Sequence, residues 1–302
     1  MKQKHILIFK NQSTKTYFFL LIALLLFGVL MMSPVAFAIE GTVEFPVVKS
    51  KVLADAGINP SEQELGVYLP PGYATSGLAY PVMYLFHGSA GTDRGFFGPQ
   101  VRYGHFDEFA ESLVAQDRMS PMIMVAPNMP GWIYAGNSWA NYFIQDIIPF
   151  VDRTYRTLRD REHRGIFGAS KGGGDVIQLV FMRPDLFSVM GAHAAAHYLS
   201  LGQLEQLAKN YDAAKYPIRF WIHHGRNDAA VPFTDSERFI AFVKGKGWEY
   251  VFEVSDGDHF TVSLDILERC FEYFSKSLGD PLTAVQPQVK LTTKWGEIKT
   301  NH

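Results

Sequence analysis

Residues 164–174 read RGIFGASKGGG and place a serine between a short apolar run and a glycine-rich segment that continues with helical periodicity. A serine with glycines two positions before and two positions after it is typical of the nucleophile elbow, a sharp strand-to-helix turn that lifts the hydroxyl out of a sheet. The glycines are needed because strand and helix approach each other closely at such a turn. Ser170 is therefore the candidate nucleophile.

On both sides of this turn, short apolar runs alternate with longer helical patterns. This alternation favours the α/β class, and specifically an α/β-hydrolase fold whose mainly parallel sheet has helices on both faces. The runs expected to be strands are 65–69, 82–86, 122–126, 164–167, 219–223 and 250–254. The segments expected to be helices are 106–115, 142–155, 173–182, 234–246 and 263–278. Pro149 should kink the second of these helices.

The first 38 residues have the organisation of an export signal. Four lysines precede an apolar run at 17–32, and the small-x-small triplet at 36–38 follows it. Cleavage after Ala38 is expected to leave 39–302 as a single catalytic domain with a weakly patterned tail at 279–302. The alternative is an uncleaved anchor, although a spanning helix usually needs about 20 apolar residues. We expect a periplasmic or secreted protein with no stable membrane anchor.

The net charge argues against a nucleic-acid partner, and the cysteine count excludes an intrachain disulfide. The 302 residues carry a net charge of −2, and loss of the signal removes four lysines and no acid, which gives −6. A negative charge of this size disfavours a nucleic-acid partner. The single cysteine, Cys270, excludes an intrachain disulfide and falls on the apolar face of a helical pattern, where a buried structural role is expected.

A serine hydroxyl needs a neutral base, and on this fold the acid and the base follow the nucleophile in the order Ser, Asp, His. Asp228 follows one predicted strand in the turn HGRND, and His259 follows the next in the turn GDHF. Both turns lie at strand ends, where parallel sheets bind ligands. Asp256 and Asp258 are competing acids on the histidine's own loop, where their simpler role is turn formation.

Backbone N–H groups at two positions are candidates for an oxyanion hole. Gly88 follows the predicted strand at 82–86 in a glycine-rich turn, and Lys171 follows the nucleophile at the start of a helix. N–H groups at these two places face the developing oxyanion in enzymes of this fold. We expect His87 to anchor the loop rather than to transfer protons.

Aromatic residues cluster in the segment 131–143, which follows a predicted strand. Trp132, Tyr134 and Trp139 stand among glycines and asparagines, so we expect them to overhang the edge near Ser170 and to bind substrate. The alternative is that the rings fill the core, which is the expected role of Phe143. This interpretation favours a bulky or aromatic acyl group over acetate.

His193 and His197 are spaced four residues apart in GAHAAAH. Two histidines at that spacing can bind a metal from one helix face, but no glutamate stands beside the first and no third ligand is in view. We therefore expect no metal, and two interpretations remain: a position in the substrate pocket or a purely structural one.

The assembled motifs resemble the Putative esterase family of α/β-hydrolases, which includes esterase D (S-formylglutathione hydrolase), feruloyl esterases and enterochelin esterases. The resemblance rests on VYLPPGY at 67–73, YPVMYLFHGSAG at 80–91, FIQDIIPFVDRTYRT at 143–157, GASKGG at 168–173, RPDLF at 183–187, and the HGRND and GDHF turns. It implies the same nucleophile, acid, base and oxyanion donors as the residues themselves. Two departures are Lys171, where these esterases usually have an apolar residue, and the alanines at 194–196, where small polar residues are common.

The expected activity is hydrolysis of a small-molecule or carbohydrate ester through an acyl-enzyme, with no cofactor. An acyltransferase would use the same triad and differ only in excluding water from the acyl-enzyme. A non-catalytic carbohydrate-binding module on the same fold is a third interpretation, and it predicts no reaction with a fluorophosphonate probe.

Overall fold

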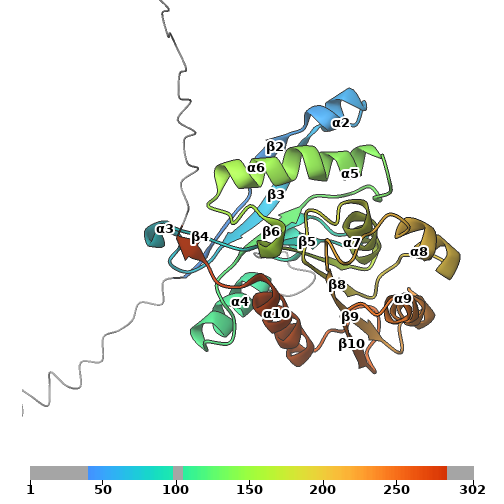
Figure 1. Cartoon of the computed structure of the whole chain (residues 1–302). Coiled ribbons are helices and arrows are strands. Elements are labelled where there is room, and N and C mark those ends of the chain that lie inside the picture. Colours follow the sequence, from blue (N-terminus) through green and yellow to red (C-terminus); the bar gives the residue numbers. More distant parts are fainter. Residues whose placement is uncertain (1–39, 98–104, 284–302) are drawn as a thin grey trace, which may run out of the picture. The chain divides into compact units, whose positions relative to one another are not determined.

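The apolar runs form one nine-stranded sheet in the computed structural model, which describes residues 40–97 and 105–283 (Figure 1). The strands are β1 (Thr42–Glu44), β2 (Val47–Lys49), β3 (Glu62–Leu69), β5 (Val82–Phe86), β6 (Ile123–Pro127), β7 (Arg164–Ala169), β8 (Val189–His193), β9 (Arg219–Gly225) and β10 (Tyr250–Ser255). Their order is β1-β3-β6-β5-β7-β8-β9-β10, and β2 pairs with β3. The strands from β5 to β10 are parallel, whereas β1, β2 and β3 form an antiparallel edge. The predicted fold class is confirmed, although β1, β2 and β8 are absent from the sequence-based prediction.

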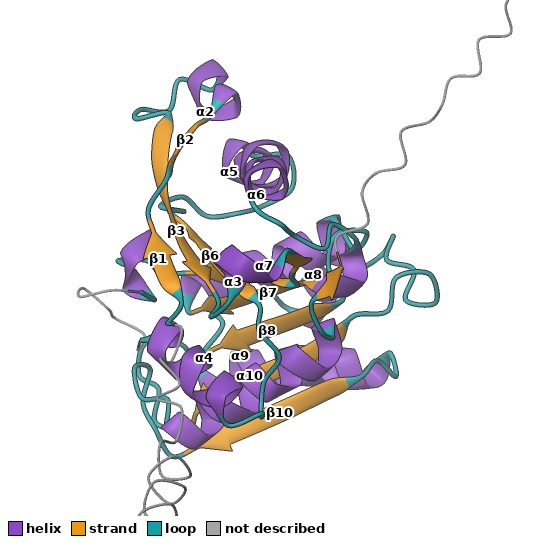
Figure 2. Cartoon of the chain, turned by 90° about the vertical axis from the view of Figure 1, so that its left-hand side faces the viewer, coloured by secondary structure: helices purple, strands orange, loops and turns teal. Residues whose placement is uncertain are grey.

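Helices cover both faces of this sheet, as predicted (Figure 2). They are α2 (Lys51–Asp55), α3 (Tyr73–Ser76), α4 (Phe106–Ala115), α5 (Ser138–Tyr142), α6 (Ile148–Thr154), α7 (Lys171–Met182), α8 (Leu201–Leu207), α9 (Phe233–Gly245) and α10 (Leu264–Leu278). Short 3-10 turns lie at Asp93–Gly95 and Arg161–His163. Helices α5, α6, α7 and α9 share one buried cluster, and α4 and α10 contribute to a second.

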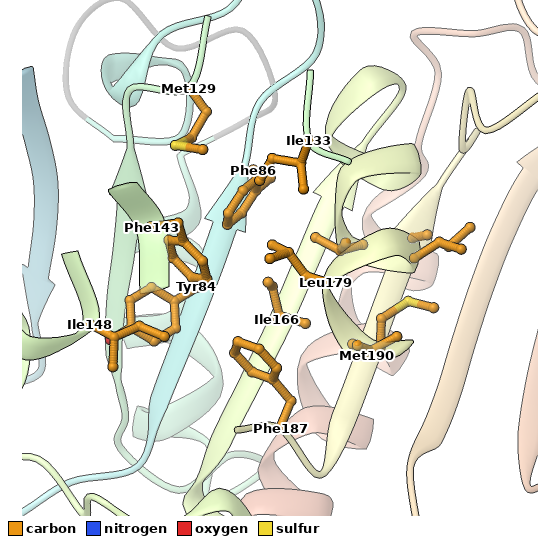
Figure 3. Close-up of a cluster of buried hydrophobic side chains, with 14 of the residues drawn as sticks. Tyr84, Phe86, Met129, Ile133, Phe143, Ile148, Ile166, Leu179, Phe187 and Met190 are labelled. Carbon is orange, nitrogen blue, oxygen red and sulfur yellow. The ribbon is translucent and has the colours of Figure 1, made fainter. Parts of the chain in front are cut away.

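The larger cluster is built around aromatic and aliphatic side chains of β5 and β7 (Figure 3). The ring of Phe143 meets Phe86 and Tyr84 edge to face, with centroids 4.8 and 5.2 Å apart. Phe143 is completely buried, so its expected core role is confirmed. Burying one such side chain stabilises the folded state by about 1.5–3 kcal/mol, so this cluster helps to hold β5 and β7 in place.

The second cluster lies beneath α10, whose apolar residues recur every three to four positions. Cys270 is 1% exposed on this face, beside Phe271 and Phe274. Burial raises the pKa of its thiol well above the usual value, which keeps the sulfur neutral and unreactive. The expected structural role of Cys270 is confirmed.

The helix predicted at 142–155 is longer than expected and changes pitch near Pro149. Residues Phe143–Ile147 form a π-helical turn between α5 and α6, in which the N–H of Ile148 donates to the carbonyl of Phe143. Proline lacks an N–H and its ring crowds the preceding turn, so the wider turn accommodates Pro149 without ending the helix.

The predicted tail begins with β11 (Leu282–Thr283), which pairs antiparallel with β4 (Leu78–Ala79). The rest of the tail at 284–302 and the predicted signal at 1–38 lie outside the described residues. Within the described ranges, no helix is both long enough and apolar enough to span a bilayer.

Candidate active site

Ser170 stands between β7 and α7 with φ 56° and ψ −118°, a conformation that non-glycine residues rarely adopt. A Cβ added at Gly168 would lie 2.1 Å from the carbonyl oxygen of Gly172, and one added at Gly172 would lie 2.2 Å from that of Phe86. Neither position has room for a side chain. The predicted elbow is therefore present, and its glycines are required by the close approach of β5, β7 and α7.

His259, from the loop after β10, and Asp228, from the loop after β9, form a hydrogen-bonded series with Ser170. The Nε2 of His259 lies 2.9 Å from the Oγ of Ser170, and its Nδ1 lies 2.6 Å from the Oδ2 of Asp228. The other oxygen of Asp228 accepts the N–H groups of Ala230 and Val231, each at 2.8 Å. Burial opposes ionisation of Asp228, but these donations and that of His259 outweigh it and lower the pKa of the carboxyl.

The two competing acids, Asp256 and Asp258, make hydrogen bonds to groups other than His259. Asp258 accepts the N–H of Phe260 at 2.9 Å and the hydroxyl of Thr261 at 2.7 Å. The backbone carbonyl of Asp256 accepts the side-chain amide of Asn227 at 2.6 Å, which joins the two loops. Of the three predicted acids, Asp228 is thus the one hydrogen-bonded to His259.

The candidate oxyanion donors are brought together by the packing of α7 on the end of β5. Lys171 is the first residue of α7, where N–H groups have no acceptor within the helix, and Gly88 lines the same cavity as Ser170. The loop is held by His87, whose Nδ1 donates to the carbonyl of Gly88 at 2.8 Å while its Nε2 accepts the N–H of Met129 at 2.9 Å. Burial lowers the pKa of His87 to about 4, so it stays neutral in its expected anchoring role.

The side chain of Lys171 is buried in an ion pair that the sequence analysis does not foresee. Its Nζ contacts the carboxylate of Asp175, one turn along α7, and donates to the carbonyl of Met129 at 3.0 Å. Asp175 also accepts the N–H of Ile133 at 2.7 Å. The cation at the N-terminus of α7 is therefore neutralised locally, and the pair ties α7 to the loop after β6.

A cavity of about 440 Å³ opens beside Ser170 and His259. Its walls are mainly apolar and come from β7, β9, α4, the start of α10 and the loops between them. The lining residues are Gly88, Ser89, Ala90, Phe106, Phe167, Ala169, Ser170, His193, Trp221, Ala230, His259, Phe260, Val262 and Leu267. This size and composition are those of a small-molecule site.

The ring of Trp132 lies beside α7, with its centroid 5.7 Å from the Nζ of Lys171. The role of Trp132, Tyr134 and Trp139 in substrate binding stays a prediction. None of the three lines the cavity at Ser170. Trp132 and Tyr134 are 44% and 59% exposed, and Tyr134 and Trp139 border a separate, shallow hollow. The indole of Trp139, a residue of α5, lies over Gly131, where a Cβ would be 1.9 Å from Nε1, so the glycine is required for α5 to pack against this loop.

His193 and His197 separate into two roles. His193 ends β8 and lines the cavity, as one interpretation predicted. His197 instead bonds the carbonyl of Asp235 at 2.9 Å and accepts the N–H of Leu199 at 2.9 Å, which is a structural role. The residues between them form a loop and not a helix, and within the described ranges no group of three potential metal ligands occurs.

His193 stacks on His223 at the end of β9, with ring centroids 4.9 Å apart, and we call these two residues the histidine pair. The Nε2 of His193 lies 3.2 Å from the carbonyl of His259, which can only accept, so this nitrogen carries the proton. The Nδ1 of His193 then accepts the Nδ1–H of His223, 2.8 Å away, and the Nε2 of His223 accepts from Ser255 at 3.1 Å. Burial lowers the pKa values of His193 and His223 to about 3 and about 4.

These features define a class of protein: an α/β-hydrolase with a serine at the nucleophile elbow and a histidine and an aspartate hydrogen-bonded to it in series. Residues 59–245, more than half of the chain, match the family described as Putative esterase. The chain belongs to this family, as its motifs predicted.

Two curated relatives are similar to this chain in sequence, and one solved structure is similar to it in fold. An esterase of Mycobacterium tuberculosis is 32% identical over 126 residues, which cover 39% of this chain and 25% of the relative. An endo-1,4-beta-xylanase/feruloyl esterase of Xylanibacter ruminicola is 27% identical over 72% of this chain and 29% of the relative. The chain thus spans less than a third of the length of either relative. A ferulic acid esterase from Anaeromyces mucronatus, solved with ferulic acid, has the same fold, with a TM-score of 0.62 at 22% identity over 79% of this chain and 91% of that one.

Proposed function

We propose that this protein is an exported serine esterase that hydrolyses carboxylic esters through an acyl-enzyme on Ser170. The observation that carries the proposal is the continuous hydrogen bonding from Ser170 to His259 to Asp228, at 2.9 and 2.6 Å, beside an apolar cavity. An activated serine needs a neutral base within hydrogen-bonding distance and a group that orients that base.

In the proposed reaction, the Nε2 of His259 takes the proton of Ser170 while the serine oxygen bonds to the ester carbonyl carbon. The carbonyl oxygen becomes an oxyanion and accepts the N–H groups of Gly88 and Lys171. His259 then gives its proton to the leaving alkoxide, and the alcohol departs. Water repeats these steps on the acyl-enzyme, which releases the carboxylic acid and restores Ser170. Asp228 holds the Nδ1–H of His259 and stabilises the imidazolium that forms.

A bulky apolar or aromatic acyl group is the substrate that the cavity favours. Phe167 and Trp221, which are 3% and 1% exposed, line this cavity, so an acyl group that packs against them is shielded from water on that side. The solved relative that binds ferulic acid, an aromatic acid, supports this choice. The acyl group is thus assigned to the cavity and not to the loop of Trp132.

Replacing Ser170 tests the reaction. Ser170→Ala should lower kcat by roughly 10⁵- to 10⁶-fold, since loss of a triad nucleophile has that effect in a well-studied hydrolase. It should also abolish covalent labelling by a fluorophosphonate. Ser89→Ala, at a second cavity-lining serine, is the matched control and should retain both properties. A Ser170→Ala enzyme with a tenth of the wild-type activity would refute the assignment.

Filling the cavity tests the acyl site. Val262→Trp should lower kcat/KM for methyl ferulate by about tenfold or more while sparing a short alkyl ester, because overpacking costs roughly 1–3 kcal/mol where the larger acyl group must fit. Trp132→Ala, outside the cavity, is the control and should change neither value. If Trp132→Ala were the variant that lost the aromatic substrate, the acyl site would lie on the aromatic loop.

Export is the remaining part of the proposal, and it rests on the lysines, the apolar run and the triplet at 36–38. Expression of the full chain in a bacterium, followed by intact-mass measurement of the exported protein, should give a chain that begins at Ile39. A chain that retains Met1 and sediments with membranes would favour an uncleaved anchor.

A further inference from the structure

Asp228 is hydrogen-bonded by two imidazoles rather than one. Its Oδ2 lies 2.6 Å from the Nδ1 of His259 and 3.0 Å from the Nε2 of His224, a residue of β9. The side chains of Asp228 and His224 are both fully buried. Nothing in the proposed reaction uses this second histidine.

The partners of His224 determine which of its nitrogens carries the proton. Nε2 faces the carboxylate of Asp228 and, at 3.2 Å, the carbonyl oxygen of Val231, and both groups only accept. Nε2 is therefore the protonated nitrogen. Nδ1 lies 2.7 Å from the hydroxyl of Ser236 on α9, which must then donate to it. Burial lowers the pKa of His224, which keeps the ring neutral despite the nearby carboxylate.

The surroundings leave His224 little freedom to turn. The ring of Phe233 meets it edge to face, with centroids 5.4 Å apart, and α9 covers it from the same side. The charged and titratable groups around it include Asp228 in its own loop, His259 from the loop after β10, and three further histidines. These are His223 beside it on β9, His193 at the end of β8 and His197 from the loop after β8. The donor to Asp228 is thus neutral, fixed and shielded from water.

We infer that His224 is a positioning residue whose Nε2–H holds the Oδ2 of Asp228 in line with the Nδ1 of His259. The inference rests on the proposed function, because it assigns a role within that same site. Two backbone N–H groups already fix Oδ1, so His224 supplies the one side-chain donor, besides His259, that fixes Oδ2 within the described residues. It also draws carboxylate charge away from His259.

The test compares variants of His224 that keep or remove the hydrogen-bond donor to the Oδ2 of Asp228. The amide nitrogen of glutamine can occupy the position of the imidazole Nε2, so His224→Gln should stay within a few-fold of wild-type kcat/KM. His224→Leu should lose roughly 10- to 100-fold, the effect of one hydrogen bond to a charged group. In His224→Leu the carboxylate charge is shared with His259 alone, so the acidic limb of the kcat/KM profile should move to higher pH, and in His224→Gln it should not.

Ser236→Ala provides a second variant in case His224→Leu fails to fold. It removes the hydroxyl that donates to the Nδ1 of His224 and helps to hold the ring in place, and it should lower kcat/KM several-fold and shift the same limb in the same direction. Equal losses in His224→Leu and His224→Gln, or unchanged kinetics in both His224→Leu and Ser236→Ala, would overturn the inference.

A spectroscopic readout separates failure of this inference from failure of the proposed function. The downfield proton NMR signal of the His259 Nδ1–H should move in His224→Leu and remain near its wild-type position in His224→Gln. A wild-type protein without esterase activity or fluorophosphonate labelling would overturn the proposed function. An active wild type whose signal is the same in all variants would overturn only the role of His224.

Discussion

Removing one member of the buried pair formed by Lys171 and Asp175 should destabilise the protein far more than removing both. The two side chains are 2% and 0% exposed, so either one alone would leave a charge out of water and without its partner. Breaking such a pair costs about 3–5 kcal/mol, whereas replacing both partners by uncharged groups is often close to neutral. Lys171→Met and Asp175→Asn should therefore each cost several kcal/mol.

The double variant Lys171→Met/Asp175→Asn should recover much of that loss. Asparagine keeps an oxygen for the N–H of Ile133, which Asp175 accepts at 2.7 Å, so this hydrogen bond survives in the double variant. We expect a coupling energy of more than about 3 kcal/mol between the two positions, because each single variant costs about 3–5 kcal/mol and the double variant should cost less than either.

Urea unfolding of the protein, followed by fluorescence, measures these differences from the shift of the midpoint at constant m-value. Lys51 and Asp55 provide the control, because they have the same i, i+4 spacing but side chains that are 82% and 64% exposed. Lys51→Met should change stability by no more than about 0.5 kcal/mol. Single Lys171 and Asp175 variants within 1 kcal/mol of wild type, or a double variant whose cost equals their sum, would refute the reasoning.

Two further predictions concern the acid and the buried imidazoles. Asp228→Asn should lower kcat by roughly 10⁴-fold because His259 is left in the wrong tautomer, whereas Asp258→Asn should have little effect; the reverse ranking in steady-state assays would move the acid to the histidine's own loop. The histidine pair has pKa values of about 3 and about 4 in the folded protein, against about 6.5 unfolded, so below pH 6.5 the unfolded chain binds more protons and stability falls. The pair should contribute about 3 kcal/mol to the loss of stability between pH 6.5 and 5 in urea titrations, and a midpoint independent of pH would contradict it.

The residues around Ser170 were predictable because their roles depend on local geometry and chain order. The elbow needs glycine two positions on either side of the serine, and the acid and base must follow at strand ends, so Asp228 and His259 could be identified without coordinates. Lys171 shows the limit of such reasoning. Its partner Asp175 is visible four residues ahead in the sequence, but burial of the pair depends on the loop after β6, which packs over it.

The missed strand β8 has a physical explanation. Both of its faces are buried, so it shows no alternation of polar and apolar residues, and Gly191 at its centre weakens the apolar signal. That glycine is required because a Cβ there would lie 2.8 Å from the rings of Phe167 and Phe274. With β8 unassigned, the contacts of His193 with His223 and with the His259 carbonyl could not be inferred.

The cavity beside Ser170 was not predictable either, because it is assembled from parts that are distant in the sequence. Phe106, Phe167, Trp221 and Leu267 come from α4, β7, β9 and α10, and each by itself has the pattern of an ordinary core residue. The segment 131–143 has the opposite character: its composition suggests a functional role, but Gly131 leaves room for the indole of Trp139, on α5, to pack against the preceding loop.

The pairing of β11 with β4 has a practical consequence for handling the protein. Residues Leu78–Ala79 lie just before β5 begins, at the amino ends of the parallel strands, whereas Ser170, Asp228 and His259 follow the carboxyl ends. The chain therefore leaves its last described strand on the side of the sheet opposite the cavity. A surface tether or fused partner introduced directly after Thr283 would start from that remote side, so coupling the protein to a solid support through this point should leave the mouth of the cavity open to bulky esters in solution.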